Sequence, residues 1–166
     1  MEKLIGIGFW EDGRFARVLQ QSKSIQEELY RKKYIEKYRH RYKDDVLVQP
    51  HHLINELWYV GKDKNKIVKY LDEGKDIASY MGKSECRICQ QSLGSHDLTD
   101  GRYLWPEKFS HYISEHNICL PDFFFRHMVG KDYKIPVLEN FNIVTQGVDD
   151  PYDKTQWNEW VLGMKK

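Results

Sequence analysis

The chain has 166 residues, of which 26 are Lys or Arg and 25 are Asp or Glu, and its formal net charge is +1. This length suits one domain, and a hydrophobic content of 40% is too high for a disordered chain. The balance of charges excludes a uniformly basic protein that coats nucleic acid, so any nucleic-acid surface must be local. We therefore expect a single folded domain over residues 1–166.

Cysteine usage and hydropathy indicate the compartment. Three cysteines are too few for a disulfide-rich scaffold, and Cys86 and Cys89 have the C-x-x-C spacing of metal-binding or redox sites inside cells. Residues 1–20 do not have the pattern of a secretory leader, and no stretch approaches the roughly 18 apolar residues of a membrane span. We expect a cytoplasmic protein without a membrane partner.

The first half of the chain predicts one strand and three helices. Residues 3–10 alternate glycine with bulky side chains and predict a strand that runs into a turn. Residues 24–42 contain no Pro or Gly and open with a capping-box spacing, so they predict the longest helix. A second helix is expected over 50–61 and a third over 63–73, where Asp63 is the N-cap. The apolar stripe of the second helix consists of Leu53, Ile54, Leu57 and Trp58.

The second half predicts a hairpin followed by short helices. A short strand is expected over 77–80, and the β-prone segments 98–99 and 103–105 are joined by Asp100-Gly101, a dipeptide typical of hairpin turns. Pro106 suits the first turn of a helix over 107–115 that ends near Asn117. Segments 123–125 and 141–144 are expected to be buried, and residues 153–162 predict a last helix.

Two thiols and two imidazoles follow one another at the spacing of a zinc site. Cys86 and Cys89 are followed, after the expected hairpin, by His111 and His116. Structural Zn²⁺ is tetrahedral and often takes two Cys and two His ligands, with the His pair three to five residues apart on a helix. The sequence therefore predicts a zinc-stapled β-hairpin and helix module, ββα-like, at about residues 80–125, and its cofactor is zinc. With the surrounding helices, the expected fold class is α+β.

The ligand assignment leaves alternatives open. Residues five apart on an ideal helix differ by about 140° in direction, so both His can face one ion only if the final turn loosens or His116 lies just past the helix end. His96 or Cys119 could replace one of the four ligands. The C-x-x-C pair could instead be a redox pair. Four protein ligands leave no open position for a substrate, which argues against a catalytic metal.

Several short motifs in segment 67–125 resemble a family of small bacterial proteins of uncharacterised function. The motifs that carry the resemblance are Tyr70-Leu71 with Gly74, Cys86-Arg-Ile-Cys89, Leu98-Thr-Asp-Gly101, Trp105-Pro106, His111-Tyr112 with His116, and Leu120-Pro121 with Phe124. The family commonly has Gly after the second Cys, where this chain has Gln90. The resemblance implies a bacterial or phage-like origin and a metal site, and it implies no reaction.

The predicted helix 24–42 carries aromatic and basic side chains together. Tyrosines recur every four residues from Tyr30 to Tyr42, interleaved with Lys and Arg. Such a surface could stack bases and neutralise phosphates, although tyrosines that anchor the helix to a core explain the same pattern. The candidate nucleic-acid-binding residues are Arg31, Tyr34, Lys37, Arg39 and Arg41.

These observations rank three functions. The first is a non-enzymatic binding, adaptor or regulatory protein with structural zinc and a protein partner. The second is a nucleic-acid-binding zinc protein that uses helix 30–43, and the third is a metal-dependent nuclease. The common nucleotide-binding loops and hydrolase motifs do not occur in the sequence.

Overall fold

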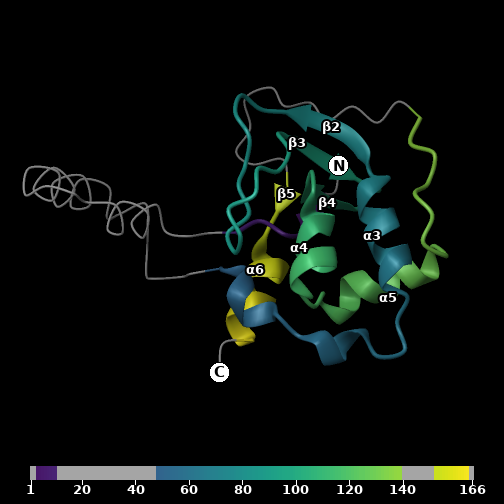
Figure 1. Cartoon of the computed structure of the whole chain (residues 1–166). Coiled ribbons are helices and arrows are strands. Elements are labelled where there is room, and N and C mark those ends of the chain that lie inside the picture. The colour runs from purple at the N-terminus through teal and green to yellow at the C-terminus, as the bar shows by residue number, and fades with distance from the viewer. Residues whose placement is uncertain (1–2, 11–47, 140–151, 165–166) are drawn as a thin grey trace, which may run out of the picture. The chain divides into compact units, whose positions relative to one another are not determined.

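The computed structural model describes residues 3–10, 48–139 and 152–164 (Figure 1). The chain divides into two compact units, one of residues 1–9 and 50–166 and one of residues 10–49. The second unit lies almost wholly outside the described residues, so the single-domain expectation stays a prediction. The predicted helix 24–42 and the predicted buried segment 141–144 also lie outside the described residues.

The first unit contains one five-stranded sheet, which makes the described fold mixed α+β as predicted. Its order is β2-β3-β4-β1-β5. Strand β3 pairs antiparallel with both β2 and β4. Strand β1 runs parallel to both β4 and β5. The strands are β1 (Leu4–Gly6), β2 (Lys75–Ser79), β3 (His96–Thr99), β4 (Tyr103–Pro106) and β5 (Tyr152–Asp153).

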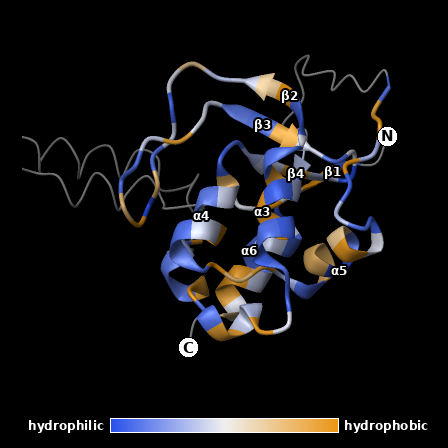
Figure 2. Ribbon diagram, turned by 45° about the vertical axis from the view of Figure 1, so that its right-hand side comes forward, coloured by the Kyte–Doolittle hydropathy of each residue, from blue (hydrophilic) through white to orange (hydrophobic). Residues whose placement is uncertain are grey.

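Four α-helices and two 3₁₀ turns accompany this sheet within the described residues. Figure 2 shows that α5 is largely hydrophobic, whereas α3 carries a wide hydrophilic face. The elements are η2 (Pro50–Leu53), η3 (Glu56–Tyr59), α3 (Lys64–Asp72), α4 (Phe109–His116), α5 (Asp122–Gly130) and α6 (Thr155–Gly163).

One part of the core of the first unit lies between α3 and the β3–β4 hairpin. The predicted helix 63–73 is confirmed as α3, and the Asp63 side chain accepts a hydrogen bond from the backbone N–H of Lys66. Its buried Tyr70 stacks on Trp105 of β4, at 5.9 Å between ring centroids. The Trp105 indole N–H donates to the carbonyl of Leu71 at 2.9 Å, so this large ring is buried with its polar atom satisfied.

The turn of the β3–β4 hairpin is held by side chains of the Leu98-Thr-Asp-Gly101 motif. The Thr99 hydroxyl donates to the carbonyl of Tyr103, and Asp100 Oδ1 accepts from the backbone N–H groups of Arg102 and Tyr103. Gly101 has φ +91°, a conformation that residues with a Cβ rarely adopt. The resembled motif is therefore a structural turn.

Two sequence predictions about helices are wrong. Residues 50–61 form the two 3₁₀ turns instead of one helix, because Ile54 makes a β-bridge with Ile118 between them and the Asn55 side chain caps η3. Pro106 is the last residue of β4, where it pairs with Asp97, and α4 begins only at Phe109.

The expected last helix is confirmed, whereas segment 123–125 is buried only in part. The predicted last helix is α6, in which Trp157 and Val161 are buried while Trp160 is half-buried. Segment 123–125 belongs to α5, a helix that the sequence did not predict; its Phe124 is fully buried, but Phe123 and Phe125 are half-buried.

Candidate metal centre

Cys86 and Cys89 lie at the tip of an irregular hairpin between β2 and β3. Ser84 and Gly94 pair at its base, and an isolated bridge joins Glu85 to Ser92. The tip is closed by two backbone hydrogen bonds, from Cys86 N–H to the Gln91 carbonyl at 2.8 Å and from Gln90 N–H to the Cys86 carbonyl at 2.9 Å.

The turn needs a left-handed residue directly after the second cysteine. Gln90 supplies it with φ 61°, and its side-chain amide donates to the carbonyl of Ile88 at 3.2 Å. This is the position at which the resembled family commonly has Gly, the residue that adopts such a φ without steric cost. The backbone N–H of Ile88 donates to the Cys86 sulfur at 3.4 Å, an arrangement that stabilises a thiolate.

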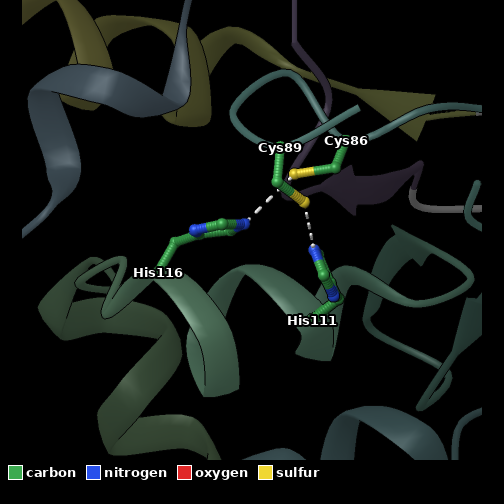
Figure 3. A group of neighbouring side chains, drawn as sticks. All are labelled: Cys86, Cys89, His111 and His116. Atoms are coloured by element: carbon green, nitrogen blue, oxygen red, sulfur yellow. Dashed lines mark hydrogen bonds between the residues drawn. The ribbon is translucent and has the colours of Figure 1, made fainter. Parts of the chain in front are cut away.

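Helix α4 provides the two imidazoles. His111 lies in its first turn, and His116 is its last residue, so the predicted helix end near Asn117 is confirmed. Asn117 is left-handed, with φ 52°, and the Ile118 N–H turns back to the carbonyl of Tyr112 at 3.1 Å. Placing His116 at the helix end allows both rings to point at the hairpin, as Figure 3 shows.

The four side chains face one another across a small space (Figure 3). Their sulfur and ring nitrogen atoms all lie within 4.8 Å of one another. Cys86 Sγ is 3.4 Å from His116 Nε2, and Cys89 Sγ is 3.3 Å from His111 Nε2. The predicted set of Cys86, Cys89, His111 and His116 therefore comes together closely enough to hold a metal ion.

The spacing of these atoms matches a tetrahedral ion of ordinary size. Zinc bonds are about 2.3 Å to sulfur and 2.0–2.1 Å to nitrogen, which places sulfur and nitrogen ligands about 3.5 Å apart at a tetrahedral angle. The separations between Cys89 Sγ and His111 Nε2 and between Cys86 Sγ and His116 Nε2, 3.3 and 3.4 Å, are slightly below that value. The whole set spans up to 4.8 Å, so an ion would draw the more distant donor atoms closer together.

The four candidate ligands differ in how far they are exposed to solvent. Cys86 is 1% exposed and His111 is 9% exposed, whereas Cys89 is exposed and His116 is half-buried. Burial, and then the neighbouring His111, lower the pKa of His116. A lowered pKa keeps its imidazole neutral at higher acidity, and the neutral ring is the form that binds metals.

Besides the four candidate ligands, Tyr112 of α4 joins the hairpin to this helix. The Tyr112 hydroxyl accepts a hydrogen bond from the backbone N–H of Arg87 at 2.9 Å. Cys86 is the one buried residue in segment 81–95, all of which the structure describes. A polar cleft of about 560 Å³, with Ser92, Glu107 and Ser114 in its lining, separates part of the hairpin from α4.

The alternative ligands lie outside this group. The His96 ring is hydrogen-bonded to Asp76, with 2.5 Å between Nδ1 and Oδ2. The backbone N–H of the buried Cys119 donates a hydrogen bond to the carbonyl of Leu53. Neither residue is among those that the described part of the chain gathers for a metal. All three cysteines are free thiols in the structure.

The structure does not test the candidate nucleic-acid-binding residues. Arg31, Tyr34, Lys37, Arg39 and Arg41 all fall in the stretch 11–47, which lies outside the described residues, so that hypothesis stays a prediction. Sequence reasoning missed Tyr112, although this residue is part of the resembled His111-Tyr112 motif. Its hydroxyl accepts a hydrogen bond from the backbone N–H of Arg87, a group that every residue except proline has, so no sequence pattern could reveal this contact.

Comparison with known proteins returns nothing further: no family model, no curated protein and no solved structure matches the chain. The resemblance to small bacterial proteins stays untested. Among the helices that the structure describes, none has the length and apolar character that crossing a membrane would require.

Proposed function

We propose that this chain is a non-enzymatic zinc-binding protein in which the metal is structural and organises a surface for a protein partner. The observation that carries the proposal is the convergence of two sulfur and two imidazole donors within 4.8 Å. Thiolate and imidazole together at a tetrahedral site favour zinc over the harder ions Mg²⁺ and Ca²⁺.

The contacts of the hairpin support a structural role for the zinc. With one buried residue in segment 81–95, the hairpin has almost no apolar core of its own. Four bonds to one ion would fix it on α4, and four protein ligands complete the coordination of zinc. A complete coordination sphere offers no position at which a substrate or reacting water could bind.

The end of α4 also fixes a short exposed apolar segment, residues 54–60. The backbone carbonyl of Asn117, which follows the ligand His116, accepts from the N–H of Asn55 at 2.9 Å. Leu57 and Val60 are 80% and 74% exposed. Large apolar side chains held rigidly at a surface favour binding of a protein partner, since little entropy is lost on docking.

The metal proposal is tested by metal analysis and thermal unfolding of the purified protein. We expect about one zinc per chain, and a melting temperature that falls by more than 10 °C when a chelator removes it, because metal binding free energy is partly folding free energy. Loss of zinc without any change in melting temperature would contradict the structural role.

The partner proposal is tested with two substitutions of equal chemistry. Leu57→Asp places a charge on the exposed apolar segment, and Val137→Asp does the same at a residue that is 85% exposed on another segment. A partner recovered from the native cells by the wild type and by Val137→Asp, but not by Leu57→Asp, would support the proposal. Equal recovery by all three proteins would contradict it.

A further inference from the structure

The two thiol ligands differ in how they meet solvent. Cys86 is 1% exposed and its sulfur accepts the N–H of Ile88, whereas Cys89 is an exposed residue. Metal-bound cysteine is a thiolate, and the thiolate is the nucleophile that oxidants and electrophiles attack. Cys89 is therefore the more accessible of the two cysteine residues to a reagent that arrives from solution.

The second thiol is already in position to complete a disulfide. The two sulfurs lie within 4.8 Å of each other. A disulfide requires about 2.05 Å, so the side chain of the exposed Cys89 would have to turn toward Cys86 to form the bond. An accessible thiolate next to a resolving cysteine is the arrangement of redox-sensing cysteines. The chain also contains a contrasting thiol, Cys119, which is 1% exposed and whose pKa is raised by burial.

We propose that Cys89 is a site of oxidation by hydrogen peroxide, and that its subsequent disulfide with Cys86 releases the metal and frees the 84–94 hairpin from α4. This inference rests on the proposed zinc site. It assigns Cys89 as the attacking thiolate and Cys86 as the resolving thiolate.

The reaction balances in two steps. The Cys89 thiolate attacks one peroxide oxygen, the O–O bond breaks, and the hydroxide that leaves takes a proton to become water; Cys89 becomes a sulfenic acid. The Cys86 thiolate then attacks the Cys89 sulfur, the S–OH bond breaks, and the second hydroxide takes a proton to become water. The two thiolates supply the two electrons that reduce one peroxide to two waters.

Metal release follows because the disulfide removes both sulfur ligands. Two imidazoles alone bind zinc far more weakly than a complete set of two thiolates and two imidazoles. Without the ion, the hairpin would keep the contact from Arg87 N–H to the Tyr112 hydroxyl but would lose the four bonds to the metal. Oxidation would thus loosen the hairpin while the buried core around Trp105 stays intact.

The test uses the full-length zinc-loaded protein and separates this proposal from the previous one. Zinc content is measured first in the reduced protein; if none is found, the zinc proposal fails. The loaded protein is then mixed with peroxide and a chromogenic chelator. We expect release of one zinc per peroxide consumed, a Cys86–Cys89 disulfide in peptide maps, and rebinding of zinc after reduction.

A sulfenic-acid trap distinguishes the two thiols. Dimedone added at early times should label Cys89 in preference to Cys86, and Cys119→Ala should release zinc at the wild-type rate. Loaded protein that keeps its zinc in excess peroxide would overturn the proposal. So would labelling that falls first on Cys86, or release that is slowed by Cys119→Ala.

Discussion

The carboxyl group of Asp100 is buried and makes hydrogen-bond contacts with four other residues. Its side chain is 0% exposed. Oδ1 accepts the N–H groups of Arg102 and Tyr103 at 2.9 and 2.7 Å. Oδ2 accepts the Tyr70 hydroxyl at 2.5 Å and lies 2.8 Å from Nε2 of His127. One side chain therefore joins the hairpin turn to α3 and α5.

Asp100→Ala removes all four of these acceptor contacts. At about 1 to 1.5 kcal/mol net for each hydrogen bond, the loss is about 4 to 6 kcal/mol, and it includes donors left without partners in a buried site. A typical domain is stable by about 5 to 15 kcal/mol, so we expect a protein that is marginally folded at room temperature. Asp100→Asn keeps an oxygen for the two backbone N–H groups and should lose about half as much.

Urea unfolding of zinc-loaded protein, followed by circular dichroism, measures both losses. Asp132→Asn is the control, because this exposed carboxylate in the described part of the chain forms an ion pair with Lys134 on the surface, and its substitution should leave the unfolding midpoint nearly unchanged. The reasoning is refuted if Asp100→Ala costs less than about 1 kcal/mol, the value of a single ordinary hydrogen bond.

Three further predictions concern the packing of the core, the attachment of the 84–94 hairpin to α4, and the dependence of stability on pH. Gly74→Ala should cost about 2 kcal/mol in unfolding free energy, because its Cβ would lie 2.7 Å from Cζ2 of the buried Trp105; a cost below about 0.5 kcal/mol would contradict that contact. Tyr112→Phe removes the acceptor for the Arg87 N–H and should lower stability by about 1 kcal/mol in urea melts, with weaker zinc retention against a chelator; an unchanged value for both would mean that this bond does not hold the hairpin. Burial raises the pKa of Asp97 above its usual 3.8, so the folded state binds this proton more tightly than the unfolded state does. The stability that this proton gives is present below the pKa of Asp97 in the unfolded state and is lost as pH rises through its pKa in the folded state. Wild type should therefore lose stability relative to Asp97→Asn between these two pKa values. A difference in unfolding free energy between the two proteins that does not change with pH would refute this prediction.

The group of four candidate metal ligands was predictable because its signature is local. The C-x-x-C turn and the His pair each lie within six residues, and the ligand chemistry restricts which residue types can occur there. The approximate position of the helix end could also be inferred, since two His five residues apart can face one ion only if the final turn loosens or the second His lies just past the helix end. The structure places His116 as the last residue of α4.

Helices whose ends depend on distant contacts were not predictable. The stripe at 53–58 has helical spacing, yet backbone pairing of Ile54 with Ile118 interrupts it. Pro106 has the φ of a helix start, but pairing with Asp97 keeps it in β4. Helix α5 was missed because its consecutive phenylalanines mask a 3.6-residue period, although Phe124 and Met128 are its buried pair.

X-ray absorption spectroscopy at the zinc edge, on protein purified without added metal, tests the central claim most directly. We predict about one zinc per chain with two sulfur neighbours at about 2.3 Å and two nitrogen neighbours at about 2.0–2.1 Å, and a sulfur signal that is lost in Cys86→Ser and Cys89→Ser double-variant protein. A metal with only oxygen and nitrogen neighbours, or protein that binds no zinc while all three thiols are reduced, would contradict the account.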